Sequence, residues 1–221
     1  MPRALTDGVW LLELRYVNVY LVQDDGLVLV DAGLPWSGSR IRAEIEEAGF
    51  GPAAVERVLL THYDLDHVGA LASLPGEPEI YAGEPDADFV AGTRRPGFGT
   101  LKRGSQQLGA IVTRPPASPV TAVADGEQIG GFTAIHSPGH TPGHVVYASE
   151  ARDVAFLGDL VMSDGKSLSP PPWYLNDDGD TLADSIERVG AELPPVSLLA
   201  PGHGAPLRGD PTRMLRDAGP R

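Results

Sequence analysis

His62-Tyr63-Asp64-Leu65-Asp66-His67 is the stretch that decides the fold. It follows an apolar run at residues 55–60, which predicts a strand ending at the polar stretch. Imidazole and carboxylate groups are common ligands of divalent metal ions. The chain holds six histidines, so two within six positions is a concentrated signal. The alternative interpretation is a polar surface turn, and the downstream sequence argues against it.

Three later stretches repeat the order of an apolar strand, a glycine and then a histidine or an aspartate. They are Pro138-Gly139-His140-Thr141-Pro142-Gly143-His144, Gly158-Asp159 and Gly202-His203-Gly204. Glycine lets the backbone turn tightly, so the polar side chain after each strand can point into a shared cleft. A further strand at residues 27–30 runs into Asp31 in the same manner.

These motifs together resemble the metallo-β-lactamase-fold hydrolase superfamily, on its glyoxalase II-like side. The first motif of that family usually reads His-x-His-x-Asp-His, and its later ligands lie in strings like those above. The resemblance covers about residues 8–207, and Asp64 stands where the second His is most common. It implies an α+β fold, a four-layer αββα sandwich with two mixed β-sheets and helices outside. We expect a single domain over residues 1–221.

The resemblance also implies two divalent metal ions and assigns their ligands. His62, Asp64 and His140 would hold the first ion, and Asp66, His67 and His203 the second. Asp159 would bridge the two, and Asp66 would also act as the catalytic residue that orients a bridging hydroxide. Two ions about 3.5–4 Å apart need such bridging anions.

The choice of metal depends on Asp64, because a carboxylate is a harder ligand than an imidazole. Zn is the first expectation, and Mn or Fe are alternatives. Asp31 and His144 are expected beneath the ligands, where they would hold a ligand imidazole or the backbone.

Residues 89–124 contain no Asp or Glu, although the chain as a whole is acidic. This stretch carries Arg94, Arg95, Lys102 and Arg103, which we expect to flank the cleft and attract an anionic substrate. The alternative is a solvated loop. Tyr63 would either face the cleft or pack beneath it. Trp173 and Tyr174 follow a proline run and would either form a pocket wall or cover the core.

The composition limits the function further. A net charge of −13 and a pI near 4.7 argue against nucleic acid and anionic membranes as partners. No apolar run is long enough to span a membrane and no signal-peptide pattern is visible, so a cytoplasmic protein is expected. The absence of cysteine leaves only nitrogen and oxygen donors for a metal. The oligomeric state is left open.

The expected activity is metal-assisted hydrolysis of a thioester, an ester or a lactone of a small molecule. Glyoxalase II proper adds a C-terminal helical region for glutathione, and only 18 residues follow His203, so strict glutathione specificity is not expected. The alternatives are a mononuclear-iron oxidoreductase similar to persulfide dioxygenases and a non-catalytic binding protein.

Periodicity gives several elements directly. Alternating apolar residues predict strands at 9–12, 17–22 and 27–30. Helical spacing predicts helices at 39–48 and 180–193, the second capped by Asp180, and a further helix beginning at 69–72.

Overall fold

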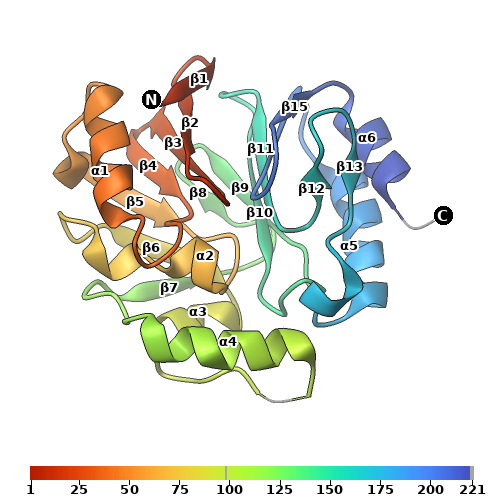
Figure 1. Cartoon of the computed structure of the whole chain (residues 1–221). Coiled ribbons are helices and arrows are strands. Elements are labelled where there is room, and N and C mark those ends of the chain that lie inside the picture. The colour runs from red at the N-terminus through yellow and green to blue at the C-terminus, as the bar shows by residue number, and fades with distance from the viewer. Residues whose placement is uncertain (98, 220–221) are drawn as a thin grey trace.

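Two β-sheets packed face to face form the centre of the computed structural model, which describes residues 1–97 and 99–219 (Figure 1). The first sheet holds, in spatial order, β1 (Arg3–Thr6), β2 (Val9–Glu13), β3 (Asn18–Asp24), β4 (Gly26–Val30), β5 (Val55–Leu59), β6 (Glu79–Gly83) and β7 (Val120–Val123). The second holds β15 (Leu207–Arg208), β14 (Leu198–Pro201), β11 (Val154–Gly158), β10 (Val145–Ser149), β9 (Phe132–His136) and β8 (Gln128–Ile129). A small hairpin joins β12 (Met162–Ser163) to β13 (Leu168–Ser169).

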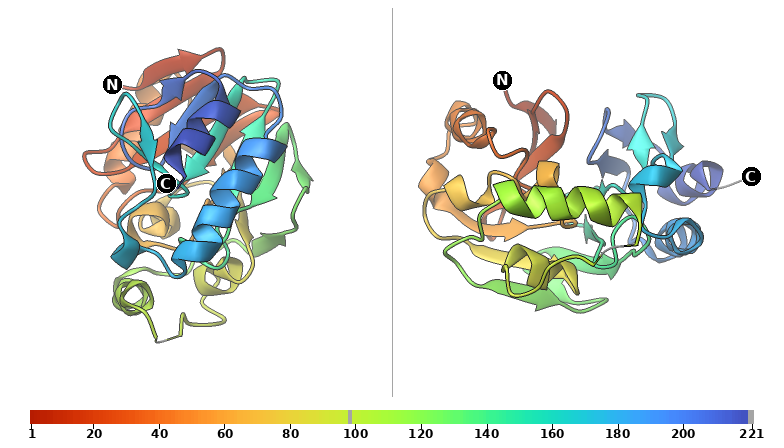
Figure 2. Two further views of the ribbon diagram at one scale, coloured as in Figure 1. Left: turned by 90° about the vertical axis from the view of Figure 1, so that its right-hand side faces the viewer. Right: turned by 60° about the horizontal axis from the view of Figure 1, so that its bottom comes forward.

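Helices cover the outer faces of both sheets. They are α1 (Gly38–Glu47), α2 (Leu65–Val68), α3 (Asp86–Val90), α4 (Leu101–Val112), α5 (Gly179–Glu192) and α6 (Pro211–Ala218). Single 3-10 turns lie at Pro52–Ala54 (η1), Leu71–Ser73 (η2) and Trp173–Leu175 (η3). Helix α1 lies outside the first sheet and α5 and α6 outside the second, while α4 crosses below them (Figures 1 and 2).

Three apolar layers hold this stack together. Strand β3 contributes to two of them, because its successive side chains point to opposite faces. Leu21 is buried toward Ile41 and Ile45 of α1, whereas Tyr20 is buried between the sheets, where its ring lies 5.1 Å from that of Phe156. The third layer packs β10 and β11 against α5 and α6. Burying one such aliphatic or aromatic side chain stabilises the fold by about 1.5–3 kcal/mol.

Parallel pairing in each sheet brings strand ends together. Strands β4 and β5 pair in parallel in the first sheet, and β11 and β14 pair in parallel in the second. Parallel neighbours end at the same edge, so the residues after them lie close to one another. The expected α+β sandwich of two mixed sheets with helices outside is therefore confirmed.

Two local expectations were wrong. Helix α5 is capped by Asp178 rather than Asp180, because the carboxylate of Asp178 accepts a hydrogen bond from the Thr181 amide at 2.9 Å. The helix expected to begin at residues 69–72, all of which the structure describes, is absent: the short helix α2 contains Asp66 and His67 and ends before Gly69, and only the 3-10 turn η2 follows. Helix α2 starts after Asp64, whose extended backbone (φ −133°, ψ 156°) lets its carbonyl accept from the His67 amide. Among the described residues, no helix combines the length and hydropathy that a membrane crossing requires.

Candidate metal centre

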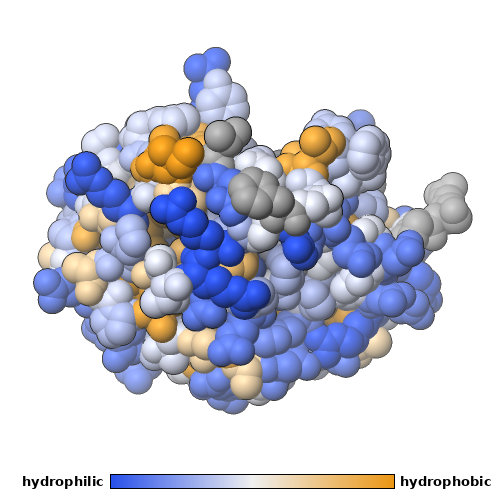
Figure 3. All heavy atoms as spheres, turned by 90° about the horizontal axis from the view of Figure 1, so that it is seen from below, coloured by the Kyte–Doolittle hydropathy of each residue, from blue (hydrophilic) through white to orange (hydrophobic). Residues whose placement is uncertain are grey.

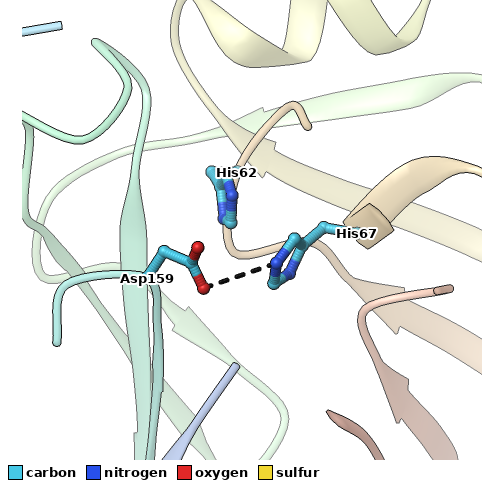
Figure 4. A group of neighbouring side chains, drawn as sticks. All are labelled: His62, His67 and Asp159. Atoms are coloured by element: carbon cyan, nitrogen blue, oxygen red, sulfur yellow. Dashed lines mark ion pairs between the residues drawn. The ribbon is translucent and has the colours of Figure 1, made fainter. Parts of the chain in front are cut away.

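Seven side chains from the sequence motifs meet at the carboxyl ends of the strands. They fall into three overlapping groups, in each of which the potential ligand atoms lie within 4.8 Å of one another. The central group is His62, His67 and Asp159, and Figure 4 shows these three facing one another. We call His62, Asp64 and His140 the first subsite, and Asp66, His67 and His203 the second subsite.

Asp31 and Thr61 orient two of the imidazoles. Nδ1 of His67 donates to Oδ2 of Asp31 at 2.8 Å. The Thr61 hydroxyl donates to the same carboxylate at 2.9 Å, which leaves its oxygen free to accept from Nδ1 of His62 at 3.0 Å. With Nδ1 donating in both rings, Nε2 is the nitrogen of each ring that faces the centre and that a metal would bind. A hydrogen bond of this kind behind a ligand fixes the ring that binds the metal.

The other two imidazoles are oriented in the same way by different acceptors. Nδ1 of His140 lies 3.0 Å from the Asn176 side-chain oxygen, and Nδ1 of His203 lies 2.7 Å from the Tyr16 carbonyl oxygen. Both partners are acceptors, so Nδ1 carries the proton in each ring. Nε2 is therefore the nitrogen of each ring that faces the centre.

Asp159 faces both subsites. Its Oδ1 lies 3.4 Å from Nε2 of His67, and its Oδ2 lies 3.3 Å from Nε2 of His203 and 3.6 Å from Nε2 of His140. His144 supports it from behind, because Nε2 of His144 accepts from the Asp159 amide at 3.1 Å. That bond occupies the Nε2 lone pair of His144, and its Nδ1 is bound to the Ser137 hydroxyl, so this ring is not placed as a ligand.

Buried atoms without partners show that the centre fits a cation. Among the described residues, Nε2 of His62, Nε2 of His67 and Oδ1 of Asp159 are buried and make no hydrogen bond. A buried polar atom left unpaired costs about 1–3 kcal/mol. All three converge in the central group, where a divalent ion would satisfy them together. Nitrogen and oxygen donors of this kind suit Zn, Mn or Fe.

The imidazoles of the second subsite hold protons when no ion is bound. Burial lowers the pKa of His203, but Asp159 and Asp66 outweigh it and raise that pKa to about 10. Burial also lowers the pKa of His67, and the surrounding carboxylates, Asp31 foremost, raise it well above its usual range. A binding ion must therefore displace protons from this subsite.

Lys102 of α4 enters the first subsite. Its side chain is 2% exposed, and its Nζ donates to Oδ2 of Asp64 and, at 2.7 Å, to Nε2 of His140. One turn further along α4, Gln106 donates to Oδ1 of Asp64 at 3.2 Å. Burial alone would raise the pKa of Asp64, but the Lys102 ammonium and the neighbouring imidazoles hold it well below its usual range.

The four basic residues expected at the cleft lie in three different environments. Lys102 is inside the first subsite, and Arg103 forms an ion pair with Asp177 at 2.6 Å. Arg94 and Arg95 line a separate cavity of about 140 Å³. The face below α4 is largely hydrophilic, with small separate hydrophobic patches (Figure 3). A role of these residues in binding substrate stays a prediction.

The aromatic residues near the centre divide between core and surface. Tyr63 packs beneath the centre, with its ring centroid 5.7 Å from that of Phe89. Trp173 and Tyr174 lie on η3 with 79% and 48% of their surfaces exposed. Their contact with a substrate also stays a prediction.

Asp86 is a supporting residue that the sequence reasoning missed. It is fully buried and accepts from the Tyr63 amide at 2.8 Å, the Thr141 hydroxyl at 2.6 Å and the Gly143 amide at 3.0 Å. These bonds tie the loop of the first motif to the loop that carries His140. Burial raises the pKa of Asp86 to about 6. The sequence did hold a signal for Asp86: it comes shortly after β6, as Asp31 comes after β4 in the same sheet.

The two sheets face each other, and histidine and aspartate side chains gather near their strand ends. This arrangement is typical of a metal-binding αββα protein. The model of the metallo-beta-lactamase superfamily matches residues 12–203, and the chain belongs to this superfamily. A probable metallo-hydrolase of Bacillus subtilis (strain 168), YqgX, is 31% identical over 190 residues, covering 84% of this chain and 83% of that protein.

Two further comparisons agree with this assignment. The hydroxyacylglutathione hydrolase GloC of Haemophilus influenzae is 29% identical over 196 residues and 85% of each chain. A solved metallo-beta-lactamase structure from Cronobacter sakazakii, described by its HARLDQ motif, superposes with a TM-score of 0.69 at 26% identity, covering 92% of this chain and 78% of that one. Together they support a metal-dependent hydrolase as the class of protein.

Proposed function

We propose that the chain is a metal-dependent hydrolase that cleaves a thioester, an ester or a lactone of a small molecule. The observation that carries this proposal is the central group, in which unpartnered buried donor atoms of His62, His67 and Asp159 converge. The similarity to a protein named hydroxyacylglutathione hydrolase supports a thioester as the first substrate class to test.

The second subsite and Asp159 supply the donors for a metal. Nε2 of His67 and Nε2 of His203 are fixed by the bonds at their Nδ1 atoms, and Asp159 lies between these rings. A divalent ion held by such donors lowers the pKa of a coordinated water toward neutrality and polarises a carbonyl oxygen.

In this proposal Asp66 orients the attacking water. Its Oδ2 lies 3.4 Å from Nε2 of His203, and its side chain is only partly buried, so it reaches both the subsite and solvent. Burial would raise the pKa of Asp66, but His67 and His203 lower it overall. Asp66 is therefore ionised at neutral pH, so its carboxylate can accept a hydrogen bond from an attacking water and orient it.

A substrate panel with defined metals tests the proposal. The protein would be stripped with a chelator, reloaded with Zn, Mn or Fe, and assayed with thioester, ester and lactone substrates, with phosphodiester and β-lactam substrates as comparisons. We expect hydrolysis of at least one carboxylic ester class, lost on chelation and restored by metal. Oxygen consumption by the iron form without hydrolysis of any panel member would contradict the proposal.

A further inference from the structure

The ammonium of Lys102 lies where the ligand atoms of the first subsite converge. It contacts two of the three members, Asp64 and His140, through the atoms that a metal would use. Both oxygens of Asp64 already accept hydrogen bonds, Oδ1 from Gln106 and Oδ2 from Lys102. Nε2 of His140 is likewise already hydrogen-bonded. Two of the three donors of the first subsite are thus satisfied by the protein itself.

The central group differs in this respect. The unpartnered buried atoms among the described residues of the centre are Nε2 of His62, Nε2 of His67 and Oδ1 of Asp159. All three belong to the central group rather than to the part of the first subsite that Lys102 contacts. The demand for a cation is therefore concentrated in the central group, around His62, His67 and Asp159, and away from the two donors that Lys102 contacts.

The start of helix α4, which carries Lys102, is anchored by the residues on either side of Lys102 in the sequence. Thr100 caps the helix by accepting from the Arg103 amide at 3.1 Å, and the guanidinium of Arg103 forms two bonds to Asp177, each 2.6 Å long. The residue before Asp177, Asn176, orients His140. The same loop thus anchors the helix carrying Lys102 and the imidazole to which Lys102 donates.

The charges in the centre match this arrangement. Asp64 is paired with the ammonium of Lys102, which leaves the carboxylates of Asp66 and Asp159 for a divalent ion. An ion in the first subsite would lie at contact distance from the ammonium. Two like charges so close repel strongly in a buried site, where water screens them little.

From these contacts we propose that Lys102 is a built-in cation that takes the place of the first metal, so that the chain binds one divalent ion, at the second subsite and Asp159. The inference rests on the proposed metal-dependent function and narrows it. It replaces the pair of ions expected from the family resemblance. Asp64, the departure from the usual motif, is the residue that receives the ammonium.

Metal stoichiometry of a lysine variant tests the proposal. The sequence has only two lysines, Lys102 and the exposed Lys166, so Lys166→Met is a matched control for Lys102→Met. Each protein would be stripped, loaded with excess Zn²⁺ alone, desalted and analysed for zinc. We expect about one equivalent in the wild type and in Lys166→Met, and about two in Lys102→Met, a twofold rise.

Amine labelling of the wild type keeps the proposal testable if Lys102→Met does not fold. The zinc-loaded protein would be reductively methylated and the labelled positions identified by mass spectrometry. We expect rapid modification of Lys166 and protection of Lys102. Two tightly bound equivalents of zinc in the wild type, with Lys102 labelled as fast as Lys166, would overturn the proposal.

The outcomes separate this inference from the proposed function. A wild type that binds two zinc ions and hydrolyses an ester overturns the inference and leaves the proposed function standing. A wild type that binds no zinc contradicts both. Equal zinc content in folded Lys102→Met and in the wild type overturns the inference alone.

Discussion

Oδ2 of Asp31 accepts a hydrogen bond from Nδ1 of His67 at 2.8 Å. The backbone of Asp31 itself is held in the left-handed region (φ 63°). The same carboxylate accepts from the amide and the hydroxyl of Thr61, and so reaches His62 as well. One buried aspartate therefore sets the orientation of two imidazoles that face Asp159.

Replacing Asp31 with asparagine should weaken metal binding without removing a ligand. An amide can donate to Nδ1 of His67, which would move the ring proton to Nε2. We expect a 10- to 100-fold loss of zinc affinity, roughly the effect of removing such a partner. Competition with a chromophoric chelator would measure it.

Asp153→Asn is the matched control. Asp153 also has a left-handed backbone (φ 54°) and binds the Ser197 amide, but it lies at the opposite end of β11 from Asp159. It should leave zinc affinity unchanged. Equal losses in the two variants would mean that Asp31 acts only on the stability of the fold.

Asp159→Ala should lower metal occupancy and reduce the rate of hydrolysis by several orders of magnitude, with the fold retained. Its carboxylate is the group that faces the rings of His67, His140 and His203 together. Elemental analysis and circular dichroism would measure occupancy and fold. The exposed Asp164→Ala is the control, and normal occupancy in Asp159→Ala would remove this residue from the ligand set.

Metal binding should release protons at neutral pH. In the metal-free protein the pKa of His203 is about 10 and that of His67 is well above its usual range. Both imidazoles are charged at pH 7 and must lose a proton to bind, so apparent affinity should rise with pH and fall in acid. We expect about two protons released per ion. Calorimetry in buffers of different ionisation enthalpy would count them, and zero release would contradict the prediction.

Asp178→Ala should lower the free energy of unfolding, because it removes the N-cap of α5. The carboxylate of Asp178 accepts from the Thr181 amide at the start of α5. Asp180→Ala, two residues further on, removes an acidic residue of the first turn but no cap, and should change the free energy of unfolding by less. Denaturant titrations of the two variants would compare them; a larger loss in Asp180→Ala would reverse the capping assignment.

The sequence predicted the fold and the grouping of these residues because several of the ligand-type side chains come within a few residues of a strand end. His62 comes after β5, Asp159 after β11 and His203 after β14, and parallel strands end together. The spacing of a motif along the chain is then enough to indicate a shared location. The roles of these residues at a metal are proposals.

The partners of these residues were harder to predict, because they come from distant segments. Lys102 lies 38 positions from both Asp64 and His140, and only the path of α4 below the sheets brings it into contact with them. Because Lys102 is basic, the sequence suggested an exposed position at the edge of the cleft, whereas its side chain is buried in the folded chain. Asn176 and Asp86 act through side-chain hydrogen bonds to other loops, which leave no periodic pattern in the sequence.

The donors around Asp159 come from both halves of the sandwich, so a bound ion would connect the two sheets and stabilise the folded chain. His67 follows the first sheet, whereas Asp159 and His203 follow the second. An ion held between them would act as a cross-link over 136 residues of chain, from His67 to His203, in a protein that has no cysteine for a disulfide. Closing so long a loop restricts the unfolded chain more than a short one does. Metal at 1,000 times its dissociation constant would add about 4 kcal/mol to the free energy of unfolding.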